Sequence, residues 1–332
     1  MKLKSLAALA ALMTSVCAAS VATATELKYA SSAPSNSPWA KLIDVLVQDT
    51  DTRTGGDLKI VPFLNSQLGD EATVIQQVAR GRVEMGGFSI TAAAVVVPEL
   101  GLLNAPFLWD STDQAACALD EHLQTSLRPY FEKRGLVNMS WGETGYQRIF
   151  ADTPVETVED LQALKIRVSP AKGSVDAFKA IGVNGVILPL TEINSGLQTG
   201  LFDAAELNIT FGVMTGAGKL APVVTRTDHV YLPSLTVVSK RAFDKLPPEQ
   251  QEVLMTASVP GPEQRRTVQS VEAALTQKLV AEGGSIVDMA PGERDRLRDE
   301  MVKSWPQLVK DIGNDAPEVW QLIQDAKAAC SD

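Results

Sequence analysis

The 332-residue sequence contains few of the residues that usually build metal and catalytic sites. It has two histidines, His122 and His229, which lie far apart in the chain without cysteines or paired acids beside them. Because a zinc site needs several such ligands at close spacing, we do not expect zinc. No serine occupies the G-x-S-x-G turn that carries the nucleophile of many hydrolases. The sequence therefore suggests neither an enzyme nor a protein with a cofactor.

Long apolar runs are also missing. No stretch of about 18 apolar residues follows the N-terminus, so we expect a protein that is not embedded in a membrane. At the N-terminus, two lysines precede the short apolar run 6–13, and residues 22–24 have the small-x-small pattern of a cleavage site. These features predict a signal peptide over residues 1–24, cleaved near Ala24, and hence an exported protein.

Positive charge is scarce throughout the chain. Lys and Arg number 30 against 40 Asp and Glu, which gives a net charge of −10. The predicted signal peptide carries two of the lysines and no acid, so the mature chain has 28 basic against 40 acidic residues. This balance argues against nucleic acid or an anionic membrane as the partner. An anionic ligand would need a dedicated positive group in its site.

Only two cysteines, Cys117 and Cys330, remain after such a cleavage. An oxidising compartment permits a disulfide between them. The sequence does not establish whether their Cα atoms come within about 7 Å of each other, as a disulfide requires. A bridge is therefore possible, and it would fix the C-terminal tail.

The hydrophobic pattern indicates alternating strands and helices. A predicted helix over 39–52 lies between predicted strands at 27–31 and 58–63, an order that indicates a βαβ unit and parallel pairing. The length is comfortable for two domains, and the chain is predicted to be nearly all helical from Pro247 onward. The other expected elements are helices at 70–80, 174–180 and 192–199 and strands at 83–88, 136–141, 147–151, 164–168, 185–189 and 230–239.

Five segments carry motifs that occur together in one family. They are FLNSQLGDEATVIQQVARGRVEMG (63–86), LLNAPFLW (102–109), VEDLQALKIRV (158–168), LPLTEINSGLQTGLFDAAE (188–206) and TDHVYLPSLTVVSKRAFDKLPPEQQEVL (227–254). In this order they resemble the substrate-binding proteins of tripartite ATP-independent periplasmic (TRAP) transporters, of the dicarboxylate-binding type. The resemblance covers nearly the whole mature chain.

The resemblance implies an α/β, two-domain periplasmic-binding-protein fold. Each domain would have a central sheet flanked by helices, with the ligand cleft between the domains and a helical C-terminal region. We expect domain I over residues 25–145 and about 231–272. Domain II is expected over about 146–230 and 273–332, including the C-terminal helices.

The resemblance also assigns a role to the arginine in the strand LKIRV. In this family the strand arginine pairs with a carboxylate of the ligand, and Arg167 is the matching position. A planar guanidinium can donate two parallel hydrogen bonds to a carboxylate. The end of a parallel strand also faces the crevice where α/β proteins bind ligands. On composition alone, a solvated or salt-bridged surface arginine is the favoured interpretation, and the motif shifts it to ligand contact.

A second position of the family divides between two neighbours. Many relatives carry another arginine in the strand after Trp141, where this chain has Gln147 followed by Arg148. Strand alternation sends these two side chains to opposite faces, so only one can reach a ligand. Gln147 is the preferred candidate, because it matches the family position. A neutral amide there would suit a monocarboxylate or 2-oxo acid better than a dicarboxylate.

The helix-strand segment of the second domain departs from the family pattern. Leu207 stands where a polar asparagine is common, and Asn208 follows one place later, so either Asn208 takes over that contact or the contact is lost. In some relatives the positions of Gln147 and Glu206 hold a sodium ion together with the ligand. The tryptophan that accompanies this arrangement is absent here, because Leu207 occupies its place.

The first domain supplies further candidate ligand contacts, namely Glu71, Ser89, Asn36 and Trp39. Glu71 has an alternative role, because an acid at a helix start favours the helix dipole. If Glu71 faces the cleft, it selects a ligand with a hydroxyl or amine. The aromatic candidates for stacking on a ligand are Phe88, Trp109, Trp141 and Phe211, although aromatic side chains more often fill cores.

The resemblance therefore implies a solute-binding subunit. It would capture a small organic carboxylate, either a monocarboxylate or 2-oxo acid or a C4-dicarboxylate-like ligand, and deliver it to the small and large membrane subunits. The protein would act without a cofactor and is expected to be a monomer. A ligand-sensing partner of a membrane receptor is the main alternative, and a secreted organic-acid enzyme is a less favoured one.

Overall fold

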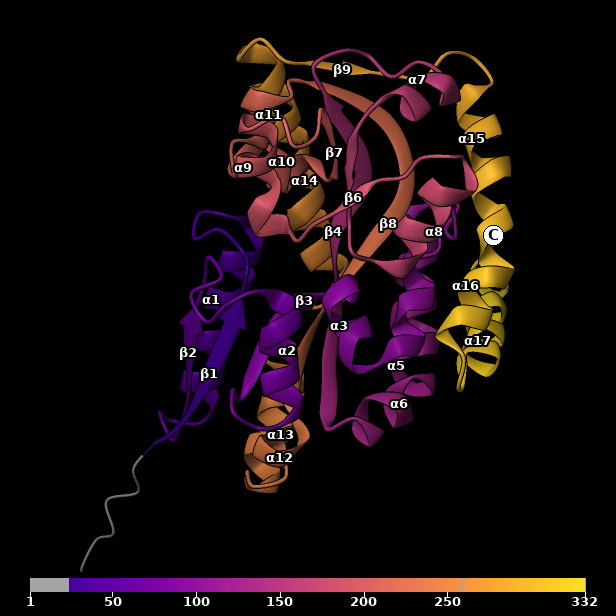
Figure 1. Cartoon of the computed structure of the whole chain (residues 1–332). Coiled ribbons are helices and arrows are strands. Elements are labelled where there is room, and N and C mark those ends of the chain that lie inside the picture. Colours follow the sequence, from indigo (N-terminus) through magenta and orange to yellow (C-terminus); the bar gives the residue numbers. More distant parts are fainter. Residues whose placement is uncertain (1–23, 258, 332) are drawn as a thin grey trace, which may run out of the picture.

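All the described strands belong to one mixed sheet (Figure 1). The computed structural model describes residues 24–257 and 259–331, so the predicted signal peptide falls outside them except for Ala24. The strand order is β2-β1-β3-β8-β4-β7-β5-β6, and β9 pairs with the start of β8. The strands are β1 (Thr25–Ser31), β2 (Leu58–Phe63), β3 (Met85–Ser89), β4 (Leu136–Ala151), β5 (Ile166–Val168), β6 (Val186–Ile187), β7 (Ala204–Leu207), β8 (Val223–Ser239) and β9 (Ser285–Val287).

Two long antiparallel strands, β4 and β8, connect the two halves of the sheet. The first half consists of β1, β2, β3 and the end of β8, which pairs with β3. The second half consists of β5, β6, β7 and the end of β4, which pairs with β7. Register shifts interrupt the β4–β8 pairing at residues 138/140, 143/145 and 147/149 of β4. The predicted domain boundaries at 145/146 and 230/231 fall inside these two strands. Irregular pairing of this kind bends a sheet, so the halves meet at a bent pair of strands.

The prediction of two separate strands at 136–141 and 147–151 is wrong, because β4 runs through both. The intervening Gly145 has a φ of +93° and lies at a register shift, so the strand absorbs it as a bulge. The late strand is likewise longer than expected, since β8 begins at Val223 instead of at residue 230. Among the short strands, β2 has the predicted bounds, whereas β7 and β9 were not predicted.

Side-chain caps explain where the main helices begin. Ser37 accepts from the backbone of Ala40 at the start of α1, and Asp70 accepts from that of Ala72 at the start of α2. The helices are α1 (Pro38–Arg53), α2 (Glu71–Ala79), α3 (Ile90–Val96), α4 (Thr112–Cys117), α5 (Gln124–Ser126), α6 (Arg128–Lys133), α7 (Val158–Ala163), α8 (Lys172–Ala180), α9 (Ile193–Gln198), α10 (Ile209–Met214), α11 (Ala217–Leu220), α12 (Lys240–Phe243), α13 (Pro248–Thr256), α14 (Gly261–Ala281), α15 (Glu293–Met301), α16 (Trp305–Ile312) and α17 (Ala316–Ala329). Short 3₁₀ helices are η1 (Pro98–Asn104), η3 (Leu190–Glu192) and η4 (Val302–Ser304), and η2 (Ala118–Leu123) is a π-helix.

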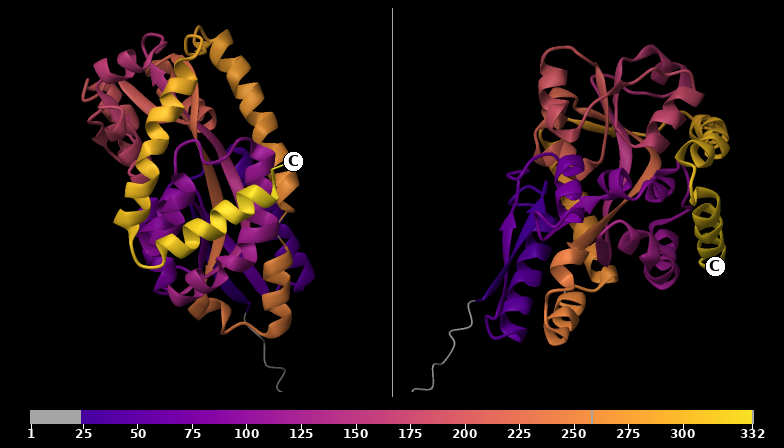
Figure 2. Two further views of the ribbon diagram at one scale, coloured as in Figure 1. Left: turned by 90° about the vertical axis from the view of Figure 1, so that its right-hand side faces the viewer. Right: turned by 60° about the horizontal axis from the view of Figure 1, so that its bottom comes forward.

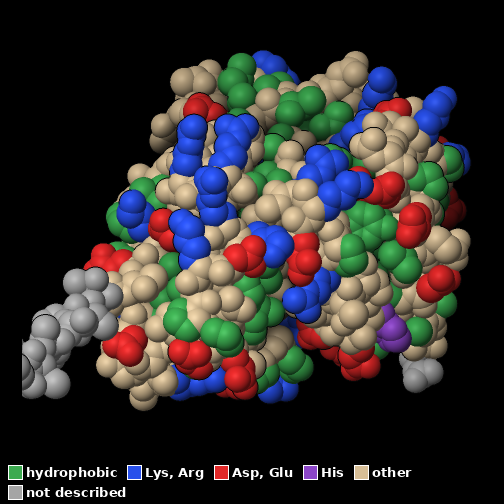
Figure 3. Space-filling view, turned by 90° about the horizontal axis from the view of Figure 1, so that it is seen from below, with side chains coloured by type: hydrophobic (Ala, Val, Ile, Leu, Met, Phe, Trp, Pro, Cys, Tyr) green, Lys and Arg blue, Asp and Glu red, His purple; other side chains and the backbone are tan. Residues whose placement is uncertain are grey.

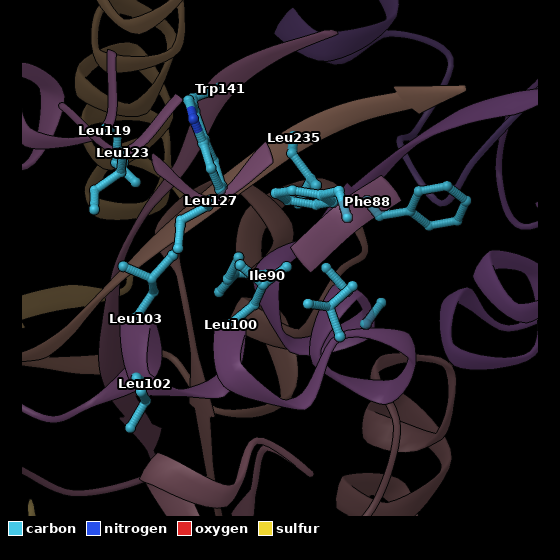
Figure 4. Packing of buried hydrophobic residues seen from close by; sticks show 14 of the residues in the cluster. Phe88, Ile90, Leu100, Leu102, Leu103, Leu119, Leu123, Leu127, Trp141 and Leu235 are labelled. Atoms are coloured by element: carbon cyan, nitrogen blue, oxygen red, sulfur yellow. The ribbon is translucent and has the colours of Figure 1, made fainter. Parts of the chain in front are cut away.

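Each half of the sheet has its own hydrophobic clusters. In the first half, residues from η1 and η2 pack together with Trp141 of β4 (Figure 4). Residues from α2 and α6 belong to the same cluster. In the second half, β5, α7, α8 and α15 share one cluster, and β7, α10 and α11 share another. Separate cores on the two sides of the long strands leave the space between the halves available for a site.

The C-terminal helices do not stay with the second half. α15 packs into the cluster of the second half, whereas α16 and α17 contribute to the cluster of the first half (Figure 2). The predicted assignment of all of 273–332 to domain II therefore does not describe its last part. Cys117 and Cys330 form a disulfide that ties the end of α17 to the first half, so the possible bridge is confirmed.

The surface carries charges of both signs. On the face seen from below, Lys and Arg side chains lie among Asp and Glu side chains, with one group of basic side chains gathered at the upper left (Figure 3). Among the described residues, no helix is both long enough and apolar enough to cross a membrane.

Candidate functional site

A cavity with a volume of about 230 Å³ lies between the two halves. The first half contributes Trp39 and Glu71, the second contributes Arg167 and Asn208, and Gln147 comes from the connecting strand β4. Hydroxyl groups are frequent in its lining, which includes Tyr29, Ser32, Ser89, Thr144, Ser169, Ser234 and Thr236. A site built from both halves can change shape when the halves move relative to each other.

Arg167 of β5 is 4% exposed and lines the cavity. Its Nε donates a hydrogen bond to the carbonyl oxygen of Leu188, and its Nη1 donates to that of Glu206, both at 2.8 Å. Its Nη2 makes no hydrogen bond with another described residue. Burial lowers the pKa of Arg167 to about 10, although the nearby Glu206 charge opposes the shift. The guanidinium therefore remains charged at neutral pH, with part of its edge available to a ligand.

Glu206 of β7 is fully buried and does not line the cavity. Its carboxylate accepts hydrogen bonds from the Ser169 backbone at 2.6 Å and from the Ser174 hydroxyl at 2.7 Å, and lies 3.2 Å from Nε2 of His229. Burial alone would raise the pKa of Glu206, but these hydrogen bonds outweigh it and the pKa is lowered. Glu206 therefore stays ionised. It does not line the cavity as Gln147 does, so the two side chains are not placed to share a sodium ion as in some relatives.

The neighbours Gln147 and Arg148 lie on opposite faces of β4, as strand alternation predicts. Gln147 lines the cavity, and its Oε1 is buried without a hydrogen-bond partner among the described residues. Arg148 lies on the other face, where it forms ion pairs with Asp228 at 2.6 Å and Glu272 at 2.8 Å. Burial alone would lower the pKa of Arg148, but the two carboxylates raise it. The structure therefore does not bring Arg148 to the cavity.

Asn208 and two aromatic side chains lie along another wall of the cavity. Asn208 caps α10 by accepting from the backbone of Phe211 at 2.9 Å, and it also lines the cavity. Phe211 stacks on Trp39, with ring centroids 4.9 Å apart, and Trp39 donates from Nε1 to the carbonyl oxygen of Glu143. This aromatic pair joins α1 of the first half to α10 of the second.

Glu71 begins α2 and lines the opposite part of the cavity. Its carboxylate accepts from the hydroxyls of Ser32 at 2.9 Å and Ser89 at 2.8 Å. Burial raises the pKa of Glu71, although the hydrogen bonds from these serines oppose the shift. Asp70, the helix cap, lies beside it in the lining. Glu71 therefore both starts the helix and faces the cavity.

The cavity lining carries more negative than positive side chains. Among the described residues, Arg167 is the one lysine or arginine of the lining, and Asp70 and Glu71 are its acids. The positive and negative groups come from different halves of the molecule. The arrangement can hold one anionic group beside Arg167 and hydrogen-bond donors of a ligand beside Glu71.

Several other predicted contacts lie outside the cavity lining. Asn36 is exposed. Trp141 is 2% exposed and packs edge-on against Phe131 at 6.0 Å, and Trp109 belongs to the same cluster. Both tryptophans therefore fill the core, as aromatic side chains more often do. Phe88 belongs to that cluster as well, yet it also lines the cavity.

Sequence reasoning missed several polar residues of the lining. Ser169 could have been found, because it follows Arg167 by two positions and so shares its face at the strand end. Tyr29 of β1 and Thr236 of β8 lie 3.4 Å apart through their hydroxyl groups, although more than 200 residues separate them in the chain. No local pattern distinguishes them. Gln264 comes from α14, and nothing in that helix marks it.

One group of possible metal ligands occurs in the described part of the chain. It consists of Cys117, His122 and Cys330, whose ligand atoms lie within 4.8 Å of one another. The two sulfur atoms are already joined to each other in the disulfide, so they do not act as thiolate ligands. The group therefore does not form a metal centre as it stands.

Comparisons with known proteins agree on one family of solute-binding proteins. The family model for bacterial extracellular solute-binding proteins, family 7, matches residues 29–311. The 2,3-diketo-L-gulonate-binding periplasmic protein YiaO of Escherichia coli K12 is 30% identical over 276 residues, which is 81% of this chain and 83% of the relative. The C4-dicarboxylate-binding periplasmic protein DctP of Vibrio cholerae is 26% identical over 273 residues, 80% of this chain and 79% of the relative.

The fold also agrees with a solved structure. The sugar acid binding protein DctPAm of Advenella mimigardefordensis, in complex with galactonate, superimposes with a TM-score of 0.86 at 23% identity, covering 93% of this chain and 99% of that one. This likeness confirms the predicted two-domain periplasmic-binding-protein fold. The chain therefore belongs to family 7 of the bacterial extracellular solute-binding proteins, the DctP-type solute-binding proteins of TRAP transporters.

Proposed function

We propose that the protein captures a small hydroxylated monocarboxylate in the cavity between its halves. The observation that carries the proposal is the free edge of Arg167 in a lining rich in hydroxyl groups. A carboxylate paired with this guanidinium forms charge-assisted hydrogen bonds, each contributing about 1.5–3 kcal/mol. The unpartnered amide oxygen of Gln147 accepts a ligand hydroxyl, and Asn208 supplies a further amide.

The acids of the cavity support a ligand with a single carboxylate. A second carboxylate would meet Asp70 and Glu71, where no cation of the lining balances it. Hydroxyl groups would instead donate to Glu71 and exchange hydrogen bonds with Ser89 and its neighbours. Sugar acids have this composition, and the named ligands of two relatives, 2,3-diketo-L-gulonate and galactonate, are of this kind. A C4-dicarboxylate, named for the Vibrio cholerae relative, fits this lining less well.

The binding cycle follows from the division into two halves. Ligand contacts from both halves favour closure around the ligand, with β4 and β8 bending at their irregular pairing. The closed protein, exported by its N-terminal leader, then presents the ligand to the small and large membrane subunits of a TRAP transporter. No step changes the ligand covalently.

A thermal-shift screen followed by calorimetry tests this proposal. The panel is D-galactonate, D-glucuronate, pyruvate and succinate. Galactonolactone, the uncharged lactone of galactonate, is the control without a carboxylate. A ligand present at about a thousand times its Kd stabilises the protein by about 4 kcal/mol. We expect stabilisation by sugar acids, little by succinate and none by the lactone. A preference for succinate, or conversion of a bound acid to product, would contradict the proposal.

A further inference from the structure

Behind the cavity, a chain of buried polar contacts joins His229 to Arg167. Nε2 of His229 lies 3.2 Å from Oε1 of Glu206, and the backbone carbonyl of Glu206 accepts from Nη1 of Arg167 at 2.8 Å. His229 is 1% exposed and Glu206 is fully buried. On its other side, Nδ1 of His229 lies 2.8 Å from the hydroxyl of Thr227, which is also buried.

The Glu206 carboxylate connects several elements at this point. It accepts from the backbone of Ser169, directly after β5, and from the hydroxyl of Ser174 in α8, while His229 approaches it from β8. These contacts fix the end of the strand that carries Arg167 and the Ser169 side chain in the cavity wall. A fully buried carboxylate is unfavourable unless all its hydrogen bonds are made, so each donor matters.

We infer that His229 is a positioning residue for the ligand's carboxylate, acting on Arg167 through Glu206. This inference rests on the proposed function of the cavity. With its Nε2 proton donated to Glu206, the imidazole draws the negative charge of that carboxylate away from the guanidinium. Arg167 then keeps its orientation, and its positive charge remains available to the carboxylate of the ligand. His229 itself touches no ligand, because it does not line the cavity.

Three variants separate positioning from ordinary packing. His229→Leu removes the donor, His229→Gln keeps an N–H at a similar reach, and Phe178→Leu is the matched control. Phe178 packs edge-on against the His229 ring at 5.4 Å but makes no hydrogen bond to Glu206. With D-galactonate as the probe in calorimetry, His229→Leu is expected to weaken binding about tenfold, or about 1.4 kcal/mol. His229→Gln and Phe178→Leu are expected to remain within about threefold of the parent protein.

A ligand-free readout accompanies the titrations. The Nε–H of the buried Arg167 donates to the carbonyl oxygen of Leu188, so in NMR spectra of the arginine side chains it should exchange slowly with water. Its signal is assigned by its loss in Arg167→Lys. We expect this protection to disappear in His229→Leu and to persist in His229→Gln and Phe178→Leu. If His229→Leu does not fold, Thr227→Val replaces it, because it removes the hydroxyl beside Nδ1 of His229. We then expect the protected Arg167 signal to disappear, whereas it persists in Phe178→Leu.

The outcomes are decisive in each direction. The inference is supported if His229→Leu binds about tenfold more weakly and loses the protected Arg167 signal, while His229→Gln keeps both the affinity and the signal. Equal losses in His229→Leu and Phe178→Leu, or an unchanged Arg167 signal in His229→Leu, overturn it. If the parent protein does not bind D-galactonate, the proposed ligand class is in question, and the Arg167 signal alone then decides the role of His229.

Discussion

Two arginines of the second half, the buried Arg167 and the half-buried Arg148, differ in the partners that the fold gives them. Arg148 on β4 is neutralised by the carboxylates of Asp228 and Glu272 on the face away from the cavity. Arg167 on β5 is held by two backbone carbonyls instead, which orient a guanidinium without cancelling its charge. A carbonyl-held arginine in a cavity is therefore available to an anion, whereas a carboxylate-held arginine is a structural element. The proposed ligand site depends on this difference.

The strongest test of the comparison removes the available arginine. Arg167→Ala is expected to weaken sugar-acid binding about 100-fold, because two charge-assisted hydrogen bonds are lost. Arg167→Lys should lose at least about tenfold, since an ammonium is a point charge without the planar fork. Calorimetry measures both, and circular dichroism checks that the fold persists. Unchanged affinity in either variant would refute the assignment of Arg167.

The acid across the cavity provides the next test. Glu71→Gln is expected to weaken binding about tenfold, because a charged acceptor for ligand hydroxyls is replaced by a neutral one. Burial raises the pKa of Glu71 in the folded protein, so its ionised form is destabilising above that raised pKa. The native state holds the proton more tightly than the unfolded state, and stability should rise as the pH falls toward the ordinary pKa.

Thermal unfolding across pH checks this sign for Glu71. Glu71→Gln should be more stable than the parent protein at neutral pH, and the difference should shrink as the pH falls toward 4.5, the ordinary pKa of the carboxyl group. A variant that is less stable at neutral pH would show that the carboxylate stabilises the fold. In that case Glu71 would resemble the structural partners of Arg148 more than a ligand group.

The sequence predicted which arginine faces the ligand site but not what holds each arginine in place. Strand alternation correctly separated Gln147 from Arg148, and the family resemblance singled out Arg167. The buried position of Glu206 was not predictable, because it depends on Ser174 and His229, which only tertiary packing brings to its carboxylate.

The fold shows the same division between local and tertiary information. Helix starts at Ser37 and Asp70 follow from local capping chemistry. The continuity of β4 does not, because Gly145 signals a break in the sequence and becomes a bulge only when β8 pairs with it. The cavity hydroxyls, such as Thr144 and Ser234, lie on these long strands and were missed for the same reason.

The structural arginine should show the opposite behaviour to Arg167. Arg148→Met removes the charge but keeps much of the apolar stem, and it leaves Asp228 and Glu272 without their cation. Removing one partner of a fully buried pair destabilises a protein by about 3–5 kcal/mol, and a smaller loss applies here because these three side chains are partly exposed. We expect such a loss in denaturant unfolding, with sugar-acid affinity within about threefold. A tenfold weaker affinity at unchanged stability would erase the distinction between the two arginines.

The smallest effect on affinity is expected from the disulfide. Cys117 lies at the end of α4, and Cys330 follows α17, whose residues share the cluster of the first half, so the cross-link does not span the boundary between the halves. Cys117→Ser with Cys330→Ser, which leaves no free thiol among the described residues, should lower the free energy of unfolding by up to about 4 kcal/mol, as expected for a cross-link that closes a long loop. Sugar-acid affinity should stay within about threefold, because closure leaves both cysteines on one side of the moving boundary. A larger loss of affinity, measured by calorimetry well below the unfolding temperature, would mean that the C-terminal helices take part in closure. Binding would then depend on a region beyond the cavity wall that holds Arg167.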